Sequence, residues 1–198
     1  MAEQETEVLP VDVHIRMIKA CFLITEQEQD TDQRMAWIKH GIEVGELIKK
    51  ESPKRVEGYY YQAVLKGRHA EQGGLSAFVE TREVEELGQK AVKIDPAYED
   101  GAPLRLMAML YAKAPPWPTS VGDVDLSLEY AERALVVSDY PLNHLIMAEV
   151  LIAAEEFDDA REELKKVLSA PNEGKWAKES GQWQPRAQRL LKQLDKNK

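Results

Sequence analysis

The sequence predicts an all-α protein of about nine helices. Hydrophobic residues make up 43% of the 198 residues and charged residues 31%, while only 11 glycines and 10 prolines interrupt the chain. In the longer segments, apolar residues recur with a period near 3.6, the helical repeat. Aromatic residues supply 7% of the chain, too few to favour a β-sandwich or barrel. Short connections between successive helices favour antiparallel hairpins.

In the first half of the chain, the sequence pattern predicts helices over residues 11–25, 35–50, 54–70 and 79–94. Asp30 or Asp32 is expected to cap the second helix, and Pro53 ends it. Gly41 and Gly45 lie one turn apart on one face, which indicates that another helix approaches closely there. The third helix carries consecutive tyrosines at 59–61; they point in directions about 100° apart, so all three cannot be core.

The second half predicts helices over residues 103–114, 123–137, 142–154, 157–168 and 185–194. Asp123 is the expected cap of the second of these helices. The segment 114–122 contains three prolines, which remove backbone donors and fix φ, so it is expected to form a loop. Only two residues, 155 and 156, separate the next two helices, which form a tight pair that Pro171 ends.

Small and large apolar residues alternate in a characteristic order over residues 142–171. The order runs through Ala148, Leu151, Phe157, Ala160, Leu164, Val167, Leu168 and Pro171. This order resembles the 34-residue tetratricopeptide repeat (TPR), in which small residues let two helices approach and large residues fill the gap to the next hairpin. The resemblance implies antiparallel hairpins stacked as a TPR-like solenoid.

Weaker copies of the same pattern precede this segment. The first-helix positions Ala63, Ala108 and Ala148 lie 45 and 40 residues apart, farther than one TPR period, with the extra residues mainly in loops. We therefore expect one TPR-like domain of three or four hairpins over residues 1–198, with a flexible start (1–10) and a basic C-terminal helix (172–198).

Three short motifs suggest a particular branch of this superfamily. They are Asp95-Pro96-Ala97-Tyr98 leading into Gly101-Ala102-Pro103-Leu104, Pro116-Trp117-Pro118 followed by Gly122-Asp123, and Asp139-Tyr140-Pro141-Leu142-Asn143-His144. Together they resemble the T-component associated with TRAP transporters. That resemblance implies a helical protein that works beside a periplasmic solute-binding protein and holds an apolar ligand. The regulators of microtubule dynamics are broadly similar in repeat character, which leaves the branch open.

The sequence contains no motif that indicates catalysis or metal binding. It has no Gly-rich phosphate loop, nucleophile elbow or His-Glu-x-x-His pattern. The acidic pairs Asp30-x-Asp32 and Asp123-x-Asp125 are interpreted as helix caps, and the four histidines are scattered along the chain. Cys21 is the only cysteine, so an intramolecular disulfide is excluded. We expect a protein that is not an enzyme and that uses no cofactor and no metal.

The net charge of −9 and pI near 5.1 argue against nucleic acid as a partner, although residues 175–198 carry seven cations against two anions. No apolar stretch approaches the roughly 18 residues that span a bilayer. The chain as it stands indicates a soluble protein, cytoplasmic, or periplasmic if an export signal has been removed.

TPR spacing counted from Ala63, Ala108 and Ala148 predicts the residues that face a partner. This inner face comprises Tyr60, Val64, Arg105, Met109, Leu145, Glu149 and Ile152. Trp117 is either a plug that pins its loop to the helices, which we favour, or an exposed partner contact. The leading hypothesis is a scaffold that binds a protein or peptide through its concave face. The alternative is a carrier of a small apolar ligand beside a TRAP-type transporter. The mixed polarity of the inner face does not decide between them.

Overall fold

The computed structural model describes residues 9–71, 76–171 and 180–196. Within these ranges the chain forms nine α-helices and no strand longer than an isolated bridge, which confirms the predicted all-α class. Contacts divide the chain into two compact units, 1–94 and 95–198. The expected flexible start lies outside the described residues except for 9 and 10.

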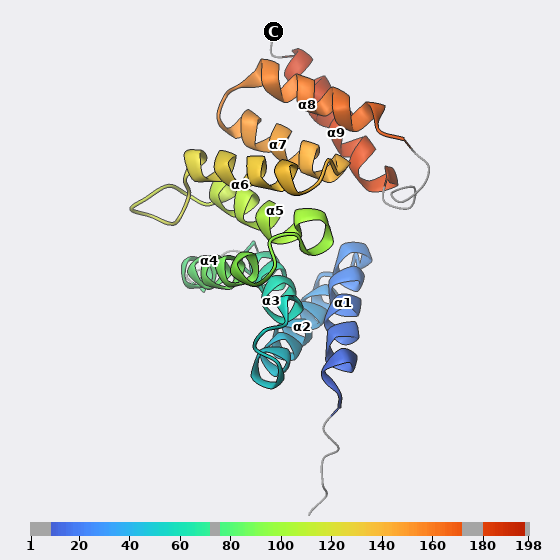
Figure 1. The fold of residues 1–198 in the computed structure, drawn as a ribbon, viewed down its shortest axis with the longest axis vertical. Helices are drawn as coiled ribbons and strands as arrows, with labels where there is room; N and C mark the ends of the chain where they lie inside the picture. The colour runs from blue at the N-terminus through green and yellow to red at the C-terminus, as the bar shows by residue number, and fades with distance from the viewer. Residues whose placement is uncertain (1–8, 72–75, 172–179, 197–198) are drawn as a thin grey trace, which may run out of the picture. The chain divides into compact units, whose positions relative to one another are not determined.

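The first unit consists of two helical hairpins (Figure 1). They are built from α1 (Val11–Gln27), α2 (Thr31–Glu51), α3 (Val56–Ala70) and α4 (Ser76–Ile94). α2 packs between α1 and α3, and α3 also contacts α1 and α4. α2 begins four residues before its predicted start because Asp30 caps it, accepting a hydrogen bond from the Gln33 backbone N–H at 2.9 Å.

The predicted close approach at the two glycines of α2 is confirmed. A Cβ added at Gly45 would lie 2.8 Å from the Gln62 side chain of α3, and one at Gly41 would overlap Leu65. Gly58 of α3 fits in the same way against Ile48 of α2. These glycines let the two helices pack at a distance that any larger side chain would increase.

The second unit contains five helices. They are α5 (Tyr98–Lys113), α6 (Val124–Val137), α7 (Pro141–Ala153), α8 (Phe157–Ser169) and α9 (Ser180–Lys196). α7 is the central helix and packs on all four others. The small residues Ala108, Ala148 and Ala160 have no exposed surface, as the TPR-like pattern predicts. Asp123 caps α6 as expected, accepting from the Leu126 backbone N–H at 3.0 Å.

Candidate interaction surface

The first unit places Tyr60 and Val64 on α3 with part of each side chain accessible. The adjacent Tyr61 is only 3% exposed and packs edge-on against Phe22 of α1, with ring centroids 5.4 Å apart. Tyr59 is half-buried. One tyrosine of the three is therefore core, and the other two reach the surface in part.

The apolar inner-face positions of the second unit mainly belong to its core. Leu145 has no exposed surface and packs among buried residues of α7 and its neighbours, so its side chain cannot contact a partner in this conformation. Met109 and Ile152 are half-buried and pack against the same core. Of the three, only Met109 and Ile152 offer accessible surface.

Glu149 on α7 forms an ion pair with Arg186 of α9, with 2.5 Å between carboxylate and guanidinium atoms. The Glu149 side chain is 12% exposed. Burial raises the pKa of this carboxyl group, and the nearby charges of Arg186 and Lys113 oppose that rise. Glu149 thus attaches α9 to α7, and a partner that used its carboxylate would have to displace Arg186.

Arg105 stabilises an unusual start of α5. Glu99, Asp100 and Gly101 have φ values of 45°, 57° and 90°, a left-handed turn that costs free energy in non-glycine residues. The guanidinium of Arg105 donates to the Asp100 carbonyl at 2.7 Å and to the Glu99 carbonyl at 2.9 Å. It also lies 5.2 Å from the centre of the Tyr140 ring. Arg105 therefore has a structural task in addition to any contact with a partner.

Asn143 joins the same turn to the start of α7. This fully buried side chain donates to the carbonyls of Ala134, Ser138 and Asp100 at 2.8–3.1 Å, and its Oδ1 accepts from Arg105 at 2.7 Å. Two of the motifs found in the sequence, 95–104 and 139–144, thus meet in one hydrogen-bond network. No periodic pattern marks Asn143; its only sequence signal is a polar residue in a predominantly apolar helix.

Trp117 is 84% exposed, so the favoured interpretation of this residue as a plug is wrong. It lies in the loop 114–123, which projects from the ends of α5 and α6 (Figure 1). Backbone hydrogen bonds close this loop: Gly122 donates to the Pro115 carbonyl at 2.9 Å and Thr119 to the Pro116 carbonyl at 3.0 Å. The loop therefore presents its indole on a defined backbone.

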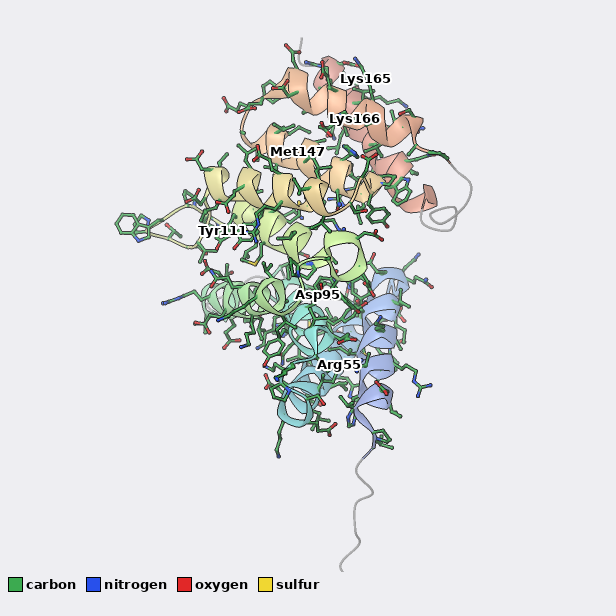
Figure 2. The ribbon with its side chains drawn as sticks, viewed as in Figure 1. Arg55, Asp95, Tyr111, Met147, Lys165 and Lys166 are labelled. Carbon is green, nitrogen blue, oxygen red and sulfur yellow. The ribbon has the colours of Figure 1, made fainter. Side chains whose placement is uncertain are left out.

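The base of the loop is fixed to the helices. The Asp123 backbone N–H donates to the Tyr111 carbonyl at 3.0 Å, and the Tyr111 ring stacks on Tyr130 of α6 at 5.7 Å. Figure 2 shows Tyr111 beside the point where the loop leaves the helices. The Ser127 hydroxyl donates to the Ala108 carbonyl at 2.8 Å and holds α6 on α5.

His144 on α7 connects two acidic side chains. Its ring nitrogens lie 2.5 Å from Glu163 of α8 and 2.6 Å from Asp139. The hydrogen bond to Glu163 is the main cause that raises the pKa of His144; burial opposes it and Asp139 adds to it. Lys166 also donates to Glu163, at 2.6 Å. This arrangement ties α7 to α8.

The described residues contain no group of three or more potential ligands arranged to hold a metal ion. In the same ranges, every helix is too short or too polar to cross a membrane. Besides Trp117, the exposed large apolar side chains of the second unit include Val136 of α6 and Phe157 of α8.

No protein-family model and no curated protein matches the chain. A thermophilic TPR protein from Thermus thermophilus, TTC0263, is similar in structure: the TM-score is 0.63 at 15% sequence identity, over 92% of this chain and 99% of that one. The chain therefore has an all-α, TPR-like fold of stacked antiparallel hairpins. None of the comparisons supports the more specific resemblance to the T-component of TRAP transporters.

Proposed function

We propose that this chain is a non-enzymatic interaction module that binds a protein or peptide partner. The exposed indole of Trp117 is the observation that carries the proposal. Tryptophan is enriched among the residues that dominate binding energy at protein interfaces, and with 84% of its surface exposed Trp117 is accessible to a partner. The hydrogen-bonded loop reduces the entropy that binding would cost.

The partly exposed inner-face residues belong to the same proposal. Tyr60 and Val64 in the first unit, and Met109 and Ile152 in the second, are partly exposed, and each can add apolar contact area within its own unit. Arg105 and Glu149 already form a hydrogen bond and an ion pair within the second unit, so we assign them a smaller part of the contact with the partner.

The alternative, a carrier of a small apolar ligand, has less support. It needs apolar side chains that line an open space. Among the described residues of the second unit, Met109, Leu145 and Ile152 instead pack against or within the core. We therefore place the protein-binding role first.

Site-specific photo-crosslinking tests the proposal. A photoreactive phenylalanine analogue is introduced at position 117 and, as a matched control, at Val136, an exposed apolar residue of α6 in the same unit. Cross-linked partners should form at 117 and be absent at 136. Equal yields of cross-linked partner at positions 117 and 136, or no cross-linked partner at 117, would contradict the proposal that the Trp117 loop binds the partner.

A further inference from the structure

The Trp117 loop carries no charge before its base at Asp123. Residues 114–122 contain three prolines, a tryptophan and a valine, and none of the nine is acidic or basic, although 31% of the whole chain is charged. The three prolines are exposed beside the indole: Pro115, Pro116 and Pro118. The surface that the loop offers to a partner is therefore mainly apolar.

The indole of Trp117 has little of its own chain around it. The loop projects from the ends of α5 and α6, and 84% of the Trp117 surface is accessible (Figure 1). Residues that dominate an interface lie in well-packed pockets from which water is excluded. The partner must supply that pocket. An extended peptide, with one row of side chains on each face, cannot enclose an indole from several sides, so the pocket belongs to a folded protein.

The first turns of α6, directly after the loop, are acidic on their outer side. Asp125 and Glu129 lie one helical turn apart and point away from the buried Ser127 and Ala131. Both acidic side chains are exposed. Over residues 123–137 there are four acidic residues and one basic residue. A negative strip thus begins where the loop joins α6.

This negative strip is available to a partner. The only basic residue of α6, Arg133, lies 3.5 Å from Glu129, but these side chains are 43% and 57% exposed, and solvent weakens such a pair to a small net contribution. Asp125 is flanked by Val124 and Leu126, which are 41% and 37% exposed. Apolar contact area therefore continues from the loop to the sides of the Asp125 carboxylate.

We infer that the partner of the Trp117 loop is a folded protein with an apolar pocket bordered by lysine or arginine side chains. The pocket receives the indole, and the basic border meets Asp125 and Glu129. The same strip repels an acidic protein surface and an anionic bilayer. This inference rests on the proposed function, that the loop binds a protein, and adds the fold and the charge of that protein.

Binding kinetics distinguish a failure of this inference from a failure of the proposed function. Charges at the border of an interface act mainly on the association rate and its salt dependence, whereas loss of a buried anchor acts mainly on dissociation. Trp117→Ala should therefore accelerate dissociation, and Asp125→Lys should slow association. Unchanged dissociation of Trp117→Ala counts against the proposed function. Unchanged association of Asp125→Lys counts against this inference alone.

Surface plasmon resonance with the full chain makes the measurement. The probe is the purified protein that cross-links at position 117, immobilised and tested at about 50 and about 300 mM NaCl. The association rate constant of Asp125→Lys should be at least threefold below that of the original chain at the lower salt, and the difference should shrink at the higher salt. Asp159→Lys is the matched control, because Asp159 is likewise an exposed aspartate in the first turn of its helix, α8. It should change association less than 1.5-fold.

Three results would overturn the inference. The first is an equal effect of Asp125→Lys and Asp159→Lys, with circular dichroism identical to that of the original chain. The second is unchanged or faster association of Asp125→Lys, which would indicate a neutral or acidic border on the partner. The third is a short linear peptide of the partner that binds as tightly as the whole partner, since the pocket would then not require a folded protein. If no protein cross-links at 117, the proposed function and this inference are both refuted.

Discussion

Replacing Asn143 by Ala should strongly destabilise the second unit. The two N–H groups of this buried amide serve three carbonyls at 2.8–3.1 Å, and its oxygen accepts from the charged Arg105. A neutral hydrogen bond contributes about 0.5–1.5 kcal/mol, and one to a charged group about 1.5–3 kcal/mol. Two neutral bonds and one charged bond lead us to expect a loss of about 2.5–6 kcal/mol.

Urea unfolding followed by circular dichroism measures this loss. Ser138→Ala is the matched control, because it removes one hydrogen bond, 3.0 Å long, from the Ser138 hydroxyl to the Asp100 carboxylate in the same network. Its cost should be about 1.5–3 kcal/mol, because the acceptor is a charged carboxylate. If Asn143→Ala costs no more than Ser138→Ala, the reasoning that the amide holds the left-handed turn onto α7 is refuted.

Three further outcomes are expected. The raised pKa of His144 implies a stabilisation that is fully present below the unfolded pKa near 6.5 and is lost as pH rises through the higher folded value. The difference in free energy of unfolding between the original chain and His144→Gln, measured by urea unfolding, should therefore shrink from pH 6 upward. A difference that grows with pH would contradict this role of His144. Ala160→Leu should lower the free energy of unfolding by about 1–3 kcal/mol, because the alanine is fully buried between helices; a loss below about 0.5 kcal/mol would mean the repeat register is wrong. Gly122→Ala should disrupt the loop, because the added Cβ would overlap the Ala114 carbonyl oxygen. Cross-linking of the partner at position 117 should then decrease. Undiminished cross-linking would show that partner binding does not depend on the loop conformation.

The helices and two of their caps were predictable from local signals, but α2, α5 and α9 begin four to five residues before their predicted starts. Asp30 and Asp123 cap helices through hydrogen bonds to backbone groups three residues away, and such short-range chemistry is visible in the sequence. Ala160 was identified as a packing position because a repeat pattern fixes which face of a helix is buried.

The candidate site was less predictable because its contacts join residues far apart in the chain. Helical periodicity placed Arg105 on an inner face but could not reveal that its guanidinium is engaged by carbonyls of a left-handed turn. It also placed Leu145 on that face, although neighbouring helices cover it completely. Trp117 lies in a proline-rich loop, where no periodic pattern indicates the direction of a side chain, and the indole points to solvent.

The most direct test of the proposed function is the affinity of the Trp117→Ala variant for a purified partner that cross-linking has identified. Truncating a tryptophan that dominates an interface costs about 2 kcal/mol or more, which corresponds to roughly 30-fold weaker binding. We predict that loss for Trp117→Ala and less than a twofold change for Val136→Ala, the comparably exposed control on α6. Equal affinity of Trp117→Ala and the original chain, with both proteins folded, would contradict the account.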